Sequence, residues 1–357
     1  MNIIKAKRLV ALALVMALAT ALMSCDLITL PSAGVGSGGG SSDGSTNVPG
    51  NNLAEKIVWL RTNVLHSGGN YIVELYANER TNRIDLDFYN SPNVTITLRG
   101  IGANRTISLL SNDWMFYVRS GITLVLGNNV TLMGNSGNER SVIIINSGGM
   151  LVMNAGSTIT SNSSAGDGGV SVNGTFTMNG GTISGNVSGW GGGGVGVNIN
   201  GTFIMNGGTI SGNVGERGGG GVRVNGGGTF IMGGGIISGN TADYGGGVYT
   251  RGIFSISNGT ISGNSATEYG GGVAVITGGA FTKNGGIITG RDASNGNTAA
   301  RSNGGHAVSV GSIGTNDRND IIYTSLRRKE TTAGSGANLS VSINNSGTSV
   351  FTGEWDN

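Results

Sequence analysis

Hydrophobic residues alternate with polar ones over short stretches that return at nearly fixed intervals along the chain. Apolar residues stand two positions apart, as at Phe203 and Met205, and such alternation is typical of a half-buried β-strand. Intervals of 24 to 27 residues indicate stacked repeats. The recurring positions are Phe176, Phe203, Phe230, Phe254 and Phe281, a second set at Ile159, Ile183, Ile210, Ile237, Ile261 and Ile288, and a third at Val170, Val195, Val222, Val248 and Val273.

Glycine-rich segments separate these strands and mark the corners between them. The stretch "GTFTMNGGTISGN" at 174–186 returns almost unchanged at 201–213. A leucine-rich repeat would need its Leu/Asn consensus, and a propeller blade about 40 residues or more. Three short parallel strands in about 25 residues instead predict a right-handed parallel β-helix, an all-β solenoid with an N-terminal capping helix.

Stacking would place each apolar side chain about 4.8 Å from its equivalent in the next turn. We therefore expect Phe176 to lie on Phe203 and Ile183 on Ile210, with Met178, Met205 and Met232 as a buried column. The asparagine after each Ser-Gly pair predicts a hydrogen-bonded ladder at one corner. Its members are Asn186, Asn213, Asn240 and Asn264.

The chain divides into five segments. Residues 1–24 have a basic start and an apolar run typical of a secretory signal peptide, and "LMSC" ends at the only cysteine, Cys25. The lipidated Cys25 and a Gly/Ser-rich tether occupy 25–50. An N-terminal cap, a helix plus strands, fills 51–93, and Asn52 with Glu55 predicts the start of its helix. The repeats cover 94–290. An irregular loop, the last turns and a C-terminal cap fill 291–357.

Composition narrows the class of protein further. The chain of 357 residues contains 70 glycines but only 3 prolines, which excludes collagen. Hydrophobic residues make up 37% and charged residues 11%, unlike a disordered chain. The formal net charge is +2, and loss of the basic leader leaves the chain close to neutral. No electrostatic footprint for nucleic acid is present.

The repeats resemble a known family pattern. "FTMN" at 176–179 and "FIMN" at 203–206, each followed by "GGTI", resemble the FxxN and GGAI motifs of chlamydial polymorphic membrane proteins. "LMSC" resembles the lipobox of bacterial lipoproteins, and the whole arrangement is similar to glycine-rich β-helix lipoproteins of spirochaetes. The resemblance implies acylation of Cys25, attachment to membrane lipid, and a role in adhesion with a host protein or glycan as ligand.

Two lines of side chains are candidates for chemistry or binding. Glu216, Asp243 and Glu268 fall at equivalent positions of successive repeats and predict an acidic line, while Trp190, Tyr244 and Tyr269 beside them predict a sugar-stacking ridge. A solvated edge explains the same residues. The outward column of the valine strand, Ser171, Gly196, Arg223, Tyr249 and Ala274, does not contain the paired carboxylates of a glycosidase.

We expect no cofactor and no metal site. The two histidines, His66 and His306, are far apart in sequence, and the glycine runs lack the regularly spaced aspartates of calcium-binding nonapeptides. Lys283 occupies the position that Met232 has in its repeat. Because a buried, unpaired ammonium is costly, we expect the last full turn to open or twist so that Lys283 reaches solvent.

The sequence thus predicts a lipid-anchored protein of the cell envelope. We expect it at the outer membrane or cell surface rather than at the periplasmic face of the inner membrane. There it would act as a non-catalytic scaffold or adhesin that does not bind nucleic acid. The alternative is a β-helix that binds polysaccharide, or cleaves it as a lyase or hydrolase.

Overall fold

The computed structural model describes residues 44–64, 68–88, 93–301, 304–315, 321–343 and 349–356. Cys25, the signal peptide, most of the tether and His66 lie outside the described residues. Among the residues described, no helix is long and apolar enough to cross a bilayer.

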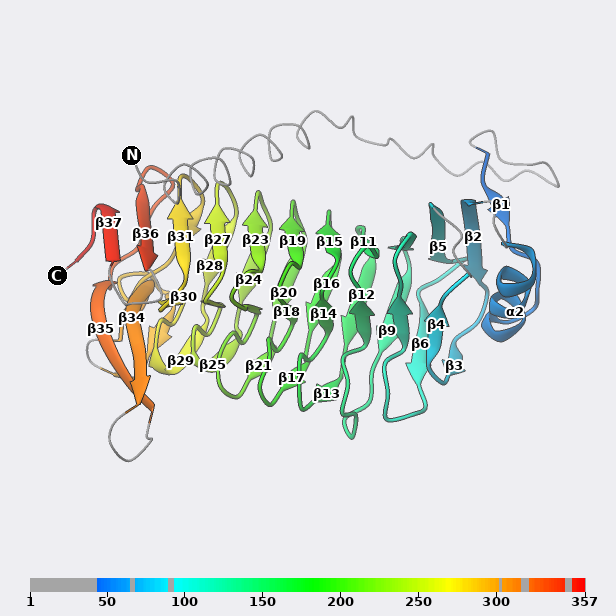
Figure 1. The fold of residues 1–357 in the computed structure, drawn as a ribbon, viewed down its shortest axis with the longest axis horizontal. Helices are drawn as coiled ribbons and strands as arrows, with labels where there is room; N and C mark the ends of the chain where they lie inside the picture. Colours follow the sequence, from blue (N-terminus) through cyan, green and yellow to red (C-terminus); the bar gives the residue numbers. More distant parts are fainter. Residues whose placement is uncertain are drawn as a thin grey trace, which may run out of the picture. The chain divides into compact units, whose positions relative to one another are not determined.

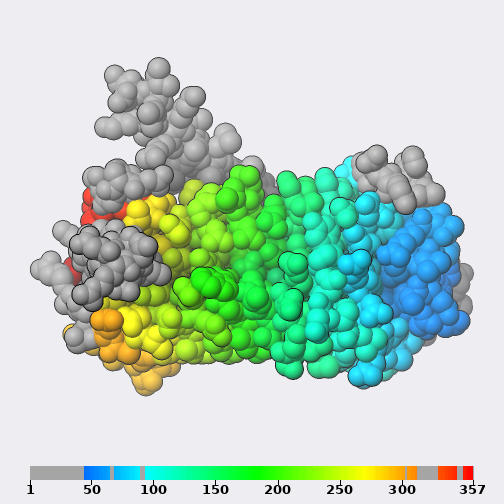
Figure 2. Space-filling view, turned by 60° about the horizontal axis from the view of Figure 1, so that its bottom comes forward, coloured from blue at the N-terminus to red at the C-terminus, as the bar shows by residue number. Residues whose placement is uncertain are grey.

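The chain folds as an all-β parallel β-helix of about nine turns, the fold class that the repeats predict. Successive turns follow one another in sequence order along the stack (Figures 1 and 2). Three long sheets form its faces, and a fourth short sheet joins them from Ser163 onward. The prediction of three strands per turn is therefore too low for this part of the stack, because the corner after each ladder asparagine is itself extended and pairs from turn to turn.

The four sheets contain the following strands. The sheet with the phenylalanines contains, in spatial order, β1 (Thr46–Asn47), β2 (Gly69–Leu75), β5 (Val94–Gly100), β8 (Ile122–Leu126), β11 (Met150–Met153), β15 (Thr175–Met178), β19 (Thr202–Met205), β23 (Thr229–Met232), β27 (Ile253–Ile256), β31 (Ala280–Lys283), β36 (Leu339–Ile343) and β37 (Ser349–Gly353). The sheet with the isoleucines contains β3 (Glu79–Thr81), β6 (Arg105–Leu109), β9 (Val130–Met133), β12 (Ser157–Thr160), β16 (Thr182–Ser184), β20 (Thr209–Ser211), β24 (Ile236–Ser238), β28 (Thr260–Ser262) and β32 (Ile287–Ile288). The valine sheet contains β4 (Ile84–Leu86), β7 (Phe116–Val118), β10 (Ile143–Ile145), β14 (Val170–Val172), β18 (Val195–Val197), β22 (Val222–Val224), β26 (Val248–Thr250), β30 (Val273–Ile276), β34 (Val308–Thr315) and β35 (Ile321–Lys329). The short sheet contains β13 (Ser163–Ser164), β17 (Val187–Ser188), β21 (Val214–Gly215), β25 (Thr241–Tyr244), β29 (Ser265–Tyr269) and β33 (Thr298–Ala299).

The predicted stacks of apolar side chains are confirmed. Phe176 pairs with Phe203 and Phe203 with Phe230, and in both pairs the ring centroids lie 4.7 Å apart. Ile183 pairs with Ile210 in the next sheet. All these side chains are fully buried, as are the three methionines of the repeats. The interior is thus one continuous apolar column, in which each turn covers the one before it.

The asparagine ladder is also confirmed, and it is longer than predicted. Asn213 Nδ2 donates to Asn240 Oδ1 at 3.0 Å, and Asn186 Nδ2 donates to Asn213 Oδ1 at the same distance. Asn297 continues the ladder beyond Asn264. The glycine before each repeat asparagine lies in the left-handed region, with φ between 62° and 65° at Gly185, Gly212, Gly239 and Gly263, where a side chain would be strained.

A helix covers the N-terminal end of the stack, as predicted. This helix, α2 (Leu53–Asn63), starts at Asn52, whose side chain accepts from the backbone N–H of Glu55. Leu53 and Leu60 are buried on its inner face. The stack extends further toward the N-terminus than expected, because β2, β3 and β4 pair in register with the next turn. The folded part also starts before residue 51, with Val48 buried beside β1.

The prediction for Lys283 is wrong. Its side chain is buried, and Nζ donates to the carbonyls of Gly334 and Ala337 at 2.6 and 2.8 Å. The last turn does not open, because β36 pairs antiparallel with β31 and closes this end of the sheet. Burial lowers the pKa of Lys283. The strand predicted at 337–345 is thus present as β36, but it is not the last, since β37 follows it.

Candidate functional site

The short sheet places four large side chains at equivalent positions of successive turns. Val187, Val214 and Thr241 are in register, and Trp190, Arg217 and Tyr244 each follow three residues later. A bulge brings Tyr269 opposite Tyr244. The predicted ridge residues therefore share one column, but an arginine that the sequence prediction omitted stands between Trp190 and the tyrosines.

The three predicted aromatic residues differ in what they expose. The Trp190 side chain is 60% exposed, and the Arg217 guanidinium lies 3.6 Å from the centre of its ring. Tyr244 and Tyr269 stack on each other with ring centroids 6.3 Å apart. Only 8% of Tyr269 is exposed, so its ring does not offer a free face to a sugar, and this part of the ridge prediction is wrong. The ring packs inward because Ala242 and Ala266 of the same ladder leave little bulk beside it.

The acidic line is present, but its carboxylates bind neighbouring side chains. Glu268 forms an ion pair with Arg301, and Asp243 accepts a hydrogen bond of 2.6 Å from the Thr267 hydroxyl. Glu216 is exposed one residue beyond the end of its ladder. Burial, together with the nearby carboxylates of Glu268 and Asp243, raises the pKa of Tyr244. The line therefore consists of separate partnered groups, one in each turn.

The outward column of the valine sheet adjoins these residues and has the register that the sequence predicts. Ser171, Gly196, Arg223 and Tyr249 pair in succession. Because Gly196 has no side chain, the Asp167 carboxyl fills the space above it, and a Cβ on Gly196 would lie 1.7 Å from Asp167 Oδ1. Sequence reasoning missed Asp167, although the glycine in an otherwise substituted column was a signal for a neighbour that needs the room.

Three donors surround the Asp167 carboxyl. Ser171 Oγ donates to Oδ2 at 2.7 Å, Asn198 Nδ2 donates to the same oxygen at 3.3 Å, and the Gly192 N–H donates to Oδ1 at 3.2 Å. Burial nevertheless dominates and raises the pKa of Asp167, while these hydrogen bonds and the charge of Arg223 act in the opposite direction. Asp167 therefore has a reduced preference for the charged form.

This pKa shift predicts a pH dependence of stability. Since the folded-state pKa of Asp167 is above the unfolded value of 3.8, its favourable contribution is complete below pH 3.8 and is lost as pH rises through the folded pKa. We expect the stability of the wild type relative to Asp167→Asn to fall over that window. Urea unfolding of both proteins between pH 3 and 8 measures it. A constant difference across this range would contradict the assignment.

Arg223 connects the two columns. Its Nη1 donates to the Trp190 carbonyl oxygen at 2.6 Å, and its Nε donates to Asn225 Oδ1 at 3.1 Å. The guanidinium lies 5.0 Å from the centre of the buried Tyr249 ring. We call Trp190, Arg217, Arg223 and Tyr249 the arginine–aromatic patch.

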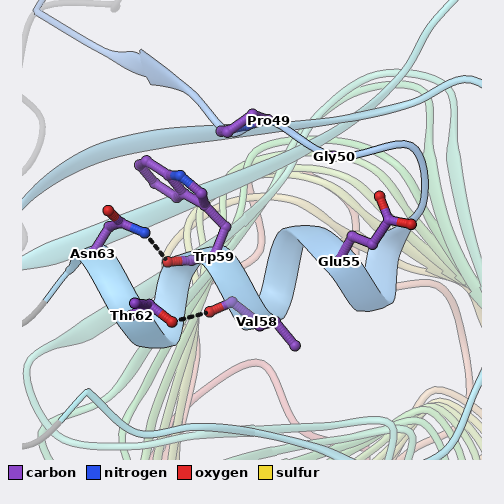
Figure 3. A pocket seen from close by; sticks show the side chains of 7 residues that line it. All are labelled: Pro49, Gly50, Glu55, Val58, Trp59, Thr62 and Asn63. Atoms are coloured by element: carbon purple, nitrogen blue, oxygen red, sulfur yellow. Dashed lines mark hydrogen bonds between the residues drawn. The ribbon is translucent and has the colours of Figure 1, made fainter.

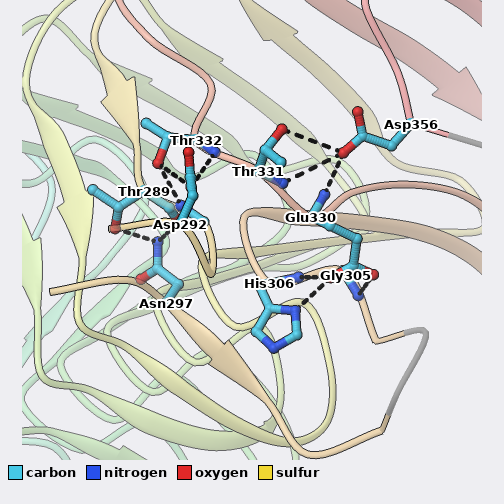
Figure 4. A network of polar contacts seen from close by, with 10 residues as sticks. Thr289, Asp292, Asn297, Gly305, His306, Glu330, Thr331, Thr332 and Asp356 are labelled. Carbon is cyan, nitrogen blue, oxygen red and sulfur yellow. Dashed lines mark hydrogen bonds and ion pairs between the residues drawn. The ribbon is translucent and has the colours of Figure 1, made fainter. Parts of the chain in front are cut away.

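Two further places have polar or concave geometry. At the C-terminal end, the Glu330 carboxylate contacts the His306 ring and accepts from the Gly305 N–H at 3.0 Å (Figure 4). Burial alone would raise the pKa of Glu330, but the bonds from His306 and Gly305 outweigh it and lower that pKa. This network joins the C-terminal cap to the stack, since Asp356 also accepts from the Glu330 N–H at 2.8 Å.

A hollow of about 410 Å³ lies along α2 and includes Pro49, Val58 and Trp59 (Figure 3). It is lined by the outer face of one helix, and Glu55, its one charged residue, bonds to Asn51 and Asn52 at the helix start. In the part of the chain that the structure describes, no three His, Cys, Asp or Glu side chains come together as metal ligands. The arginine–aromatic patch is therefore the strongest candidate for a functional surface.

No protein-family model, no curated protein and no solved structure matches this chain.

Proposed function

We propose that this chain is a membrane-anchored extracytoplasmic β-helix lipoprotein that acts as a surface scaffold or adhesin. The sequence of the leader supports the anchor: a basic start, an apolar run and "LMSC" ending at Cys25. Acyl chains on Cys25 would attach it to membrane lipid, at the outer membrane or cell surface. The short Gly/Ser-rich segment then leads directly into β1, which places the solenoid next to its anchor along the chain.

The observation that carries the binding role is the arginine–aromatic patch on a regular scaffold. The interior of the stack is apolar, and its polar ladder is buried, so that variation between turns falls on outward positions. The carboxylates of Asp243 and Glu268 are bound to a hydroxyl and a guanidinium rather than placed together as an acid and a base. These features favour display and binding over catalysis.

Protease treatment of intact cells tests the proposed location. We expect added protease to remove the protein from intact cells, and Cys25→Ser to release it from the membrane fraction, because the thiol is the only site for the acyl chains. A periplasmic protein with the same expression level serves as the control for cell integrity. Survival on intact cells with degradation in lysed cells would place the protein in the periplasm and contradict the adhesin role.

The alternative is a polysaccharide-binding or polysaccharide-cleaving β-helix. The exposed ring of Trp190 favours it, because aromatic faces contact the apolar faces of sugars. Assays for reducing ends and for unsaturated sugar products separate hydrolase and lyase activity from binding alone. Turnover that is lost in an Asp243→Asn, Glu268→Gln variant would support the enzymatic form.

A further inference from the structure

We infer that the arginine–aromatic patch is a receptor for carboxylate-bearing sugars of an acidic polysaccharide. This inference rests on the proposed binding role and specifies its ligand. It also moves the ligand site from the predicted acidic line to arginines that sequence reasoning did not select.

The first argument is the position of Arg223. Its bonds to the Trp190 carbonyl and to Asn225 hold the guanidinium in place above Tyr249. The second N–H of Nη1 and both N–H groups of Nη2 have no protein partner among the described residues. An arginine held in this way loses little side-chain entropy when it binds, and its planar fork matches a carboxylate with two parallel hydrogen bonds.

The second argument is the charge of the patch. Neither Arg217 nor Arg223 lies within ion-pair distance of a carboxylate in the described part of the chain, in contrast to Arg301, which is paired with Glu268. Asp167 is enclosed by its three donors, and burial favours its neutral form. The patch therefore presents two unneutralised guanidinium groups to an incoming anion.

The third argument is the open face of Trp190. Arg217 covers one face of the ring from the following turn. In the preceding turn, Gly166 stands where the column would otherwise have a side chain, and a Cβ there would meet only Ser164 Oγ within 4 Å. A sugar ring can therefore lie on the second face of Trp190 while its carboxylate reaches Arg223, whose Nη1 already contacts the Trp190 backbone.

A matched pair of ligands tests the inference on the whole mature protein. Calorimetric titration compares a tetrasaccharide of galacturonic acid with the tetrasaccharide of galactose that has the same linkage but no carboxylates. We expect the acidic ligand to bind at least tenfold more tightly, and its affinity to fall as salt is raised because exposed charges are screened. Equal affinity for the two ligands, or binding of neither, would overturn the inference.

Variants then locate the site. Arg223→Gln and Trp190→Ala are each expected to weaken binding of the acidic ligand at least tenfold, and Glu216→Gln to strengthen it by removing a nearby negative charge. Arg83→Gln is the matched control, since Arg83 also lies over a tryptophan, Trp114, but its charge is paired with Asp113. Trp190 and Glu216 are exposed, so these variants keep the fold if Arg223→Gln does not. Binding that survives both Trp190→Ala and Arg223→Gln would place the ligand elsewhere.

The outcomes remain distinct from those of the proposed function. A protein that is removed from intact cells by protease but does not discriminate the two tetrasaccharides would retain its surface role and lose this ligand. A protein that discriminates them but faces the periplasm would retain the ligand and lose the adhesin role.

Discussion

Asn213→Ala is expected to lower the free energy of unfolding by about 4 kcal/mol, because removal of one ladder amide leaves several buried polar groups without partners at about 1–3 kcal/mol each. The side chain donates to Asn240 Oδ1 and to the Ile183 carbonyl, and it accepts from both the backbone and the side chain of Asn186. All these atoms are in the interior, where water cannot replace the lost bonds.

The matched control is Asn206→Ala. Asn206 Nδ2 also donates to an equivalent asparagine, Asn179, at 3.0 Å, but this second ladder is exposed. We expect a loss below about 1 kcal/mol, since water replaces the partner. Urea unfolding together with hydrogen exchange of the flanking turns measures both effects, because a repeat protein can lose turns locally. Equal losses for the two variants would show that the buried ladder does not stabilise the stack.

Phe203→Ala is the second large expected effect, with a loss of about 3–5 kcal/mol for a fully buried phenylalanine. The ring lies between those of Phe176 and Phe230, each at 4.7 Å, so its removal leaves a cavity that two rigid neighbours cannot fill. Ile204→Ala is the control at the next position, which faces outward. A loss below about 0.5 kcal/mol for Phe203→Ala would mean that the register of the turns is different.

The regular part of the fold could be predicted because each turn repeats the same physical requirements. The phenylalanine, isoleucine and asparagine columns depend on neighbours one repeat away, and those neighbours have the same residue type. Lys283 could not be placed in this way, since its partners Gly334 and Ala337 belong to a non-repeating segment about 50 residues later. The short sheet was missed because strands such as Val187–Ser188 are too brief to show alternation.

The candidate surface was predicted in part. The positions of Trp190 and of the acidic residues in successive turns follow from the repeat interval. Arg217 has the same interval from Trp190 and from Tyr244, so the arithmetic that found the aromatics also contained the arginine. The burial of Tyr269 and the position of Asp167 over Gly196 could not be predicted, because both depend on the space that small neighbours leave.

The near-identity of adjacent turns has a consequence for the gene that encodes them. Val187 and Val214 are equivalent in register, so deletion of the 27 codons for residues 187–213 would join Asn186 to Val214 and place equivalent partners in contact again. Unequal recombination between such repeated segments would then shorten or lengthen the stack by one turn, about 4.8 Å, without a mismatch in the core. A population of alleles that differ by whole turns is the genetic trace that this architecture permits.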